Sequence, residues 1–250
     1  MVDLADPNEQ ARPQQPPAAM RTENAVGRGS ARLAGVLFDV DGTLVDSNDA
    51  HARAWVEALK EFGHDVPFAR VRRLIGMGGD KLLAETAGID AESDEGKAIQ
   101  KRRLEIFSER YLRHLSPCRG ARALVQRIRA DGLKIVVASS AKADELRPLL
   151  ERAQVADLID DTTSSDDAPR SKPDPDIVRA ALRRGGLSAE RAVMIGDTPY
   201  DIEAAGRSGV AVIALRCGGW DDDGLRGAIA IYDDPQHLLE HYDSSPLGAR

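Results

Sequence analysis

Short apolar runs alternate with longer amphipathic segments along most of the chain. Four of the apolar runs are nearly continuous, which is typical of strands buried on both faces of a parallel sheet: residues 35–38, 134–138, 192–195 and 210–215. Helical spacing of apolar residues characterises the segments between the runs. This alternation predicts a doubly wound, Rossmann-like α/β fold with a parallel sheet. The expected strands are 35–38, 134–138, 158–159, 192–195, 210–215 and 228–232, and the expected helices between them are 121–130, 142–152, 174–184 and 200–207.

One interval interrupts the alternation. Between residues 48 and 115 no segment has strand character, and helical patterns occur at 51–62, 81–87 and 96–114. An interval of about 70 residues is too long for a simple crossover connection. We therefore expect an inserted α-helical cap domain at residues 48–115.

The rest of the chain divides around this insert. Residues 32–47 and 116–243 are expected to form the α/β core. Residues 1–31 are rich in Pro, Gln, Ala and Arg and have no apolar periodicity, which predicts a disordered N-terminal tail. Residues 244–250 are expected to form a flexible C-terminal tail.

Charge and composition narrow the classes of partner. The 250 residues carry 34 Lys and Arg against 41 Asp and Glu, a net charge of −7. An acidic surface disfavours nucleic acid or an anionic membrane as the main partner, and no apolar run approaches the roughly 18 residues of a membrane span. The two cysteines, Cys118 and Cys217, are too few for a disulfide framework. Without a secretory signal pattern, we expect a cytoplasmic protein, either monomer or homodimer.

Polar side chains follow four of the expected strands. Because ligands bind beyond the carboxyl ends of strands in parallel α/β sheets, these side chains are expected to meet at one edge. The first strand is followed by Asp39-Val40-Asp41-Gly42-Thr43, the second by Ser139-Ser140, the third by a loop that contains Lys172, and the fourth by Gly196-Asp197 and then Asp201.

This set of side chains has a coherent chemistry. Crowded carboxylates repel one another and tend to stay protonated unless a cation lies between them. Mg²⁺ prefers carboxylate, carbonyl and water oxygens. A carboxylate beside such an ion can attack phosphorus, and a second carboxyl group can protonate the departing alkoxide. A lysine and hydroxyl groups can bind the phosphoryl oxygens.

The four motifs, which occur in order within residues 35–201, resemble those of the haloacid dehalogenase-like (HAD) hydrolases. The helical insert after the first motif is similar to the cap of that family. The resemblance implies that Asp39 is the nucleophile and Asp41 the acid/base, and that Mg²⁺ binds to Asp39, the backbone carbonyl of Asp41, and Asp197.

The resemblance also assigns supporting roles. Asp201 would stabilise the site from behind the metal ligands. Ser139 and Lys172 would bind phosphate, and Lys172 would also neutralise the nucleophile. Thr43 and Ser140 would assist in phosphate binding through hydroxyl or backbone contacts.

Asp41 discriminates between reactions within the family. Dehalogenases attack carbon and lack this acid, whereas an alkoxide leaving group needs its proton. The residues therefore favour a phosphatase of the phosphoglycolate phosphatase branch, which would hydrolyse a small phosphorylated metabolite such as a sugar phosphate. A non-catalytic HAD-like binding module is disfavoured because every motif acid is present.

A β-phosphoglucomutase-like phosphotransferase is the alternative. The segment from His51 to Trp55 resembles that enzyme, but Ile75 and Gly79 stand where its cap carries cations. Arg72, Arg73 and Lys81 are near these positions but out of register. For His51 and Trp55, packing at the start of the cap and a role near the hinge or substrate are both open. The same holds for residues 76–79, as a turn or as a substrate-facing loop.

Overall fold

The computed structural model describes residues 32–248. The expected N-terminal tail lies outside the described residues, as do residues 249 and 250. Six parallel strands form one sheet, in which β1 lies between β2 and β4. In spatial order the strands are β3 (Asp161–Thr163), β2 (Lys134–Ala138), β1 (Gly35–Phe38), β4 (Ala192–Gly196), β5 (Ala211–Leu215) and β6 (Ala230–Tyr232).

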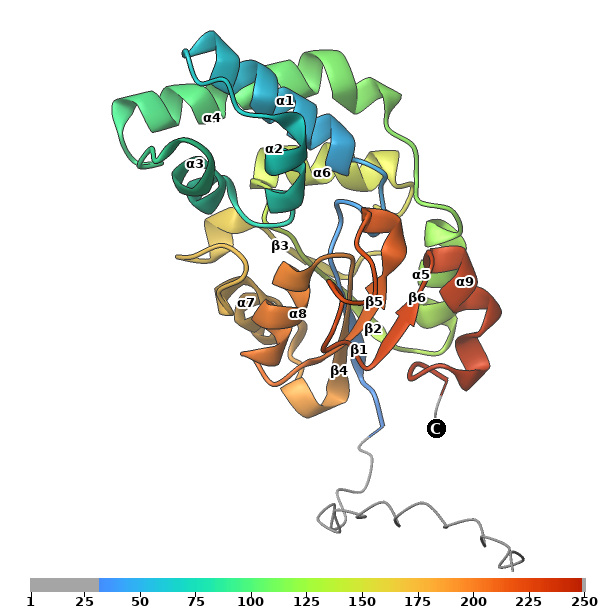
Figure 1. The fold of residues 1–250 in the computed structure, drawn as a ribbon. Coiled ribbons are helices and arrows are strands. Elements are labelled where there is room, and N and C mark those ends of the chain that lie inside the picture. The colour runs from blue at the N-terminus through green and yellow to red at the C-terminus, as the bar shows by residue number, and fades with distance from the viewer. Residues whose placement is uncertain (1–31, 249–250) are drawn as a thin grey trace, which may run out of the picture. The chain divides into compact units, whose positions relative to one another are not determined.

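Alternate residues of the central strands face opposite layers of helix. Val36 and Phe38 pack in the core cluster that includes Leu124 and Leu146, and Leu37 packs with Ile177 and Ala204 in the other cluster. This period of two is that of a strand buried on both faces. The predicted doubly wound fold is confirmed (Figure 1). The helices of the first layer are α5 (Ala121–Ala130), α6 (Ala143–Arg152) and α9 (Pro235–Glu240), and those of the second are α7 (Asp176–Gly185) and α8 (Pro199–Gly206).

The insert after β1 is entirely helical. Figure 1 shows its helices gathered beyond the carboxyl ends of the strands. They are α1 (Asn48–Glu61), α2 (Phe68–Leu74), α3 (Gly79–Ala87) and α4 (Asp94–Ile106), followed by a π-helical turn (Phe107–Tyr111) and a 3₁₀ turn (Leu112–His114). A core with an inserted helical cap is therefore confirmed. The described residues belong to one compact unit, and the domain bounds at 48 and 115 stay a prediction.

Some of the expected elements are displaced or end differently. The strand expected at 158–159 is wrong, because β3 is Asp161–Thr163 and Leu158 is buried in the core before it. The C-terminal tail was expected to be flexible from residue 244, but Ser245 and Leu247 are buried. Among residues 32–248, no helix has both the length and the apolar character needed to cross a membrane.

The register of the central strands positions the site. Phe38 pairs with Val137 on one side and with Ile195 on the other. Asp39 therefore leaves the sheet at the level of the last residues of β2 and β4, where Ser139 and Asp197 follow.

Candidate active site

Three buried carboxylates form a cluster at this edge of the sheet. Asp39, Asp197 and Asp201 each offer an oxygen within 4.8 Å of the others. Asp39 follows β1, Asp197 follows β4, and Asp201 lies in the first turn of α8. The convergence expected from the strand ends is therefore present in the structure.

A fully buried lysine contacts two of these carboxylates. Lys172, in the loop between β3 and α7, places Nζ 2.5 Å from Oδ1 of Asp39 and 2.8 Å from Oδ1 of Asp201. Burial alone would lower the pKa of Lys172, but the two carboxylates outweigh it and raise that pKa. The lysine therefore stays protonated beside the carboxylates.

One ammonium group does not balance three carboxylates. Burial raises the pKa of Asp39 to about 7, with Asp201 and Asp41 adding to the effect of burial and Lys172 opposing it. Burial and the neighbouring Asp39 and Asp201 raise the pKa of Asp197 well above its usual range. Both groups are destabilised as anions without a further cation. An all-oxygen donor set with excess negative charge fits a hard divalent ion.

Asp197 is held from two sides. Thr43 Oγ1 donates to its Oδ1 at 3.0 Å, and Asn48 Nδ2 donates to its Oδ2 at 2.8 Å. Two glycines leave room for this carboxylate: a Cβ at Gly42 would lie 2.3 Å from Oδ2, and one at Gly218 would lie 1.8 Å from it. The hydroxyl of Thr43 thus positions a carboxylate, and its expected assistance in phosphate binding stays a prediction.

Asp201 has two functions in the fold. With Thr198 it forms the capping box of α8, in which Oδ2 of Asp201 accepts from the Thr198 backbone N–H at 3.1 Å and from its hydroxyl at 2.7 Å. Its other oxygen pairs with Lys172. The helix cap therefore also fixes a neighbour of the lysine.

The side chain of Asp41 contacts residues at the start of the helical insert. Ser47 Oγ donates to Oδ1 of Asp41 at 2.5 Å, and His51 Nε2 lies 2.8 Å from the same oxygen. Burial opposes ionisation, but His51, Ser47 and Arg103 together lower the pKa of Asp41. The two aspartates of the first motif thus have opposite shifts, as expected of groups with different tasks.

His51 is held in a defined orientation. Its ring stacks on Phe107 with centroids 4.0 Å apart, and Arg103 Nη2 lies 2.6 Å from Nδ1. Because a guanidinium can only donate, Nδ1 accepts and Nε2 carries the proton directed at Asp41. His51 therefore packs within the cap and also lines the cavity, and its role near the hinge or substrate stays a prediction. Arg103 is fixed in turn by Glu145, at 2.7 and 2.9 Å.

Four residues of this site were missed by the sequence reasoning: Ser47, Asn48, Arg103 and Glu145. Ser47 and Asn48 lie four and five residues after Thr43 of the first motif, at the start of α1, so their position was a usable signal. Arg103 and Glu145 lie in separate helices, α4 and α6, and neither has a local pattern that distinguishes it from a surface charge.

A cavity of about 580 Å³ opens on Asp39 and Asp41 between core and cap. The cap loop 76–79 lines it, as does Ser140, whose buried Oγ has no hydrogen-bond partner among the described residues. Ser139 is buried beside it, and its Oγ accepts from the Ala141 N–H at 3.1 Å. The cations that line the cavity are Lys97, Lys101, Arg103 and Lys142.

The cations considered from the sequence have other partners. Arg72 donates to Asp49 at 2.7 Å and to the Gly218 carbonyl at 2.6 Å, and Arg73 lies over the ring of Trp220. Lys81 pairs with Asp174. None of the three is among the described residues that line the cavity, whereas Ile75 and Gly79 are.

Fold and site together define a class of enzyme: a doubly wound sheet whose first strand ends in a paired aspartate motif, with a helical insert that covers the site. The chain belongs to the haloacid dehalogenase-like hydrolases, whose family model matches residues 36–215. The resemblance found in the four sequence motifs is thereby confirmed.

Individual relatives cover most of the chain. Phosphoglycolate phosphatase of Rhodospirillum rubrum is 33% identical over 208 residues, which span 80% of this chain and 86% of that protein. N-acetylmuramic acid 6-phosphate phosphatase of Pseudomonas aeruginosa is 29% identical over 218 residues, 85% of this chain and 96% of that protein. The crystal structure of a hydrolase from Pseudomonas syringae matches with a TM-score of 0.77 at 30% identity, over 84% of this chain and 98% of that one.

Proposed function

We propose that the enzyme is a magnesium-dependent phosphatase that hydrolyses a small phosphate monoester, such as a sugar phosphate or a phosphoglycolate-like compound, through an aspartyl-phosphate. The observation that carries the proposal is the pairing of Asp39 with Lys172 at 2.5 Å, beside two further carboxylates and at the base of a cavity. Relatives named as phosphatases over most of the chain's length support the same reaction.

The metal would be held by Asp39, the backbone carbonyl of Asp41, and Asp197. Burial and mutual repulsion, which raise the pKa values of Asp39 and Asp197, support a cation at this place. Asp201 is the less suitable ligand, because Thr198 and Lys172 already engage its two oxygens. Bound Mg²⁺ would screen the negative charge of the phosphoryl group and of the attacking carboxylate.

In the first step a carboxylate oxygen of Asp39 attacks phosphorus, and the bond from phosphorus to the ester oxygen breaks. Lys172 neutralises the nucleophile and the phosphoryl oxygens. The departing alkoxide takes a proton from Asp41. The negative charge of a bound phosphate raises the pKa of Asp41, so that this carboxyl can carry the proton needed here. Ser139 and the free hydroxyl of Ser140 would bind phosphoryl oxygens.

In the second step Asp41 takes a proton from water, and the resulting hydroxide attacks the phosphorus of the aspartyl-phosphate. The bond between phosphorus and Asp39 breaks, which restores the carboxylate and releases inorganic phosphate. The low pKa of Asp41 in the free site suits the ionised form with which this step begins. His51, which donates from Nε2, holds the carboxylate in place.

The cavity favours a small anionic substrate. Its volume of about 580 Å³ accommodates a metabolite, and the cap loop 76–79 is part of its wall. Lys97, Lys101 and Lys142 line the cavity and offer cations to a bound anion, in a wall that also carries carboxylates such as Glu92 and Asp166. The cytoplasmic location expected from the sequence stays a prediction.

A β-phosphoglucomutase-like phosphotransferase is the second candidate. The same three lysines favour it, because a mutase must retain a bisphosphate with two anionic ends. These lysines do not occupy the positions where the sequence comparison placed the cations of the mutase, which favours hydrolysis.

The function is tested with a panel of phosphate monoesters in the presence of Mg²⁺, with release of inorganic phosphate as the readout. We expect turnover of a sugar phosphate or a phosphoglycolate-like ester, complete loss in EDTA and recovery on addition of Mg²⁺. Turnover that persisted in EDTA would contradict the metal-dependent mechanism. For the mutase, β-glucose 1-phosphate is supplied with a bisphosphate primer, and glucose 6-phosphate as the main product would replace the phosphatase proposal.

A further inference from the structure

We infer that four residues form a latch between cap and core that positions Lys172: Asp80 and Lys81 at the start of α3, and Ser171 and Asp174 in the loop between β3 and α7. The inference rests on the proposed function, in which Lys172 neutralises the nucleophile. It adds positioning residues that lie outside the carboxylate cluster and act on it through the backbone of this loop.

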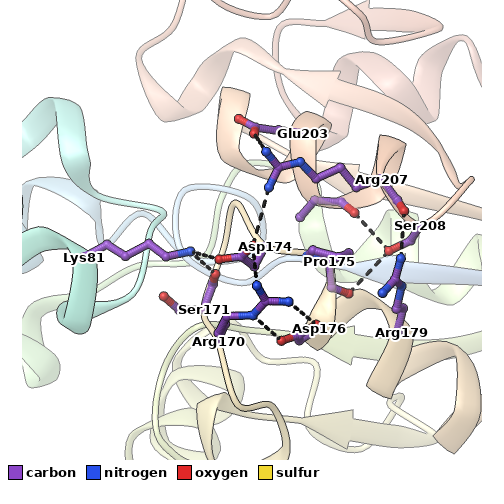
Figure 2. A network of polar contacts seen from close by, with 11 residues as sticks. Lys81, Arg170, Ser171, Asp174, Pro175, Asp176, Arg179, Glu203, Arg207 and Ser208 are labelled. Atoms are coloured by element: carbon purple, nitrogen blue, oxygen red, sulfur yellow. Dashed lines mark hydrogen bonds and ion pairs between the residues drawn. The ribbon is translucent and has the colours of Figure 1, made fainter.

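The latch consists of reciprocal polar contacts. Lys81 Nζ lies 2.6 Å from the Ser171 carbonyl and 2.6 Å from Oδ2 of Asp174. In the opposite direction, Ser171 Oγ donates to Oδ1 of Asp80 at 2.5 Å. Figure 2 shows Lys81 extending from the cap to the loop, where both of its partners lie. Two successive cap residues thus hold two points of one core loop.

The loop held in this way carries Lys172. Ser171 immediately precedes the lysine, and Asp174 follows two residues later, so the contacts enclose Lys172 in the sequence. Lys172 Nζ must reach Asp39 at 2.5 Å and Asp201 at 2.8 Å at the same time. A small shift of the loop would lengthen both distances, and misplacement of a catalytic group by about 1 Å can reduce a rate about 100-fold.

Asp174 also has partners from the core, but at longer distances. Arg170 and Arg207 each approach its Oδ1 at 3.5 Å, on the side away from Lys81 in Figure 2. Among the described residues, Lys81 is the cap residue with an ion pair to Asp174, and its distance is shorter by 0.9 Å. The cap therefore provides the firmest contact of this carboxylate, and the core arginines provide a matched control.

Glycines let the cap loop reach the core at two places. A Cβ on Gly78 would lie 2.2 Å from Cβ of Ser171, and one on Gly76 would lie 2.7 Å from Cγ2 of Thr198. Thr198 caps the helix that holds Asp201. The cap loop thus packs on both loops that orient the lysine. The placement of Lys172 therefore depends on the position of the cap over the site.

The first test replaces Lys81. In Lys81→Met we expect kcat to fall about tenfold or more, with a smaller change in KM, because binding of the ester is retained while the nucleophile loses its well-placed cation. Lys81→Arg should restore most of the rate. In the matched control Arg207→Met, which removes a core partner of the same carboxylate, kcat/KM should stay within about twofold of wild type.

The second test changes the close approach of Gly78 to Ser171. Gly78→Ala is expected to show the defect of Lys81→Met, because its methyl group displaces Ser171. Gly206→Ala is the control, since a Cβ there meets no atom within 4 Å. Thermal unfolding midpoints near that of wild type in all variants would separate loss of positioning from loss of the fold.

A substrate-independent readout separates the latch from the proposed function. Amide hydrogen exchange of residues 170–176 should accelerate at least about threefold in Lys81→Met and remain unchanged in Arg207→Met. If no phosphate ester is turned over by wild type but this exchange changes as stated, the proposed function fails and the latch remains. An active enzyme in which Lys81→Met changes neither kcat nor exchange overturns the latch.

Discussion

The strand-end cluster and the outer surface of the cap contain ion pairs of the same length in opposite surroundings. Lys172 and Asp39 lie 2.5 Å apart with side chains 0% and 8% exposed, and Arg102 and Glu61 of the cap lie 2.5 Å apart with side chains 30% and 43% exposed. Water screens the surface pair, so its loss has little effect. Loss of one partner from a buried pair typically costs about 3–5 kcal/mol, because the other charge stays buried.

The comparison shows which charged groups of this enzyme influence one another. In the core, Lys172 and Asp201 both act on the pKa of Asp39, and the two carboxylates raise the pKa of Lys172, so these residues work as a unit. In the cap, charges that face water also pair, as Arg102 does with Glu61, but water screens the pair. Cap residues that face inward, such as His51 and Arg103, join the unit of the core. Distance to a partner alone therefore does not identify a functional charge.

The largest expected effect comes from breaking the core unit at the nucleophile. Asp39→Asn keeps the shape of the side chain but removes its negative charge, and we expect kcat to fall by about 10⁴-fold or more. Release of inorganic phosphate at saturating ester measures the loss. Asp46→Asn, an exposed acid in the same segment, serves as the control and should keep its activity. Full activity of Asp39→Asn would exclude Asp39 as the nucleophile.

A smaller effect is expected from the cap residue that reaches into the core. His51→Gln removes a partner that lowers the pKa of Asp41, and we expect kcat to fall about 100-fold. Because that pKa rises, Asp41 keeps its proton to a higher pH, and the acidic limb of the kcat–pH profile moves toward higher pH. The profile of the variant across the acid range measures this shift.

A second cap histidine makes the comparison sharper. His64 lies 2.9 Å from Glu95 on an exposed surface, so it resembles His51 in having a carboxylate partner. His64→Gln should leave both kcat and its pH profile unchanged. Equal effects of the two substitutions would contradict the division between inward and outward charges.

The smallest expected effect is on stability and is set by pH. The pKa of Asp39 is raised to about 7, and that of Asp197 is also raised, so the folded state binds protons more tightly than the unfolded state. Stability of the metal-free protein should therefore fall as pH rises from about 4 to about 7. Mg²⁺ relieves the repulsion and should raise the unfolding midpoint more at pH 8 than at pH 5.

The size of this metal effect follows from mass action. At a free concentration about 100 times its dissociation constant, a ligand stabilises the folded state by about 2.7 kcal/mol. Calorimetry with and without Mg²⁺ at the two pH values measures it. The stabilisation should vanish in Asp197→Asn and persist in Asp233→Asn, which changes an exposed acid paired with Arg216. Equal stabilisation by Mg²⁺ at both pH values would contradict the proposal that Mg²⁺ stabilises the protein by relieving repulsion among the carboxylates.

The central sheet was predictable because its strands are buried on both faces. β1 and β4 are continuous apolar runs, and a carboxylate follows each of them. The hydrophobic pattern and the expected site residues therefore indicated the same strand ends. The edge strand β3 was misplaced, since its residues Asp161 to Thr163 are polar and the apolar pair Leu158 and Ile159 lies just before it. At the edge of a sheet a strand is held by backbone pairing on one side, which leaves a weak mark in the sequence.

The residues of the candidate site also fall into those that could be predicted from the sequence and those that could not. Asp39, Lys172 and Asp197 stand at strand ends and in a loop whose positions follow from the fold. Arg103 lies in the helical insert and Glu145 in a helix of the α/β core, and their contact with each other depends on how the insert packs on the core. No periodicity in either helix specifies that packing, so these residues could be found only in the structure.

The two glycines around Asp197 have a consequence for how the protein tolerates mutation. Gly42 and Gly218 carry no reactive group and lie far apart in the chain, yet a methyl group at either would occupy the space of the same carboxylate oxygen. In a library of random variants both positions should appear as intolerant as a catalytic acid. The activity would therefore depend in part on the absence of a Cβ atom at these two positions. A search for functional residues limited to charged and polar side chains would overlook both glycines.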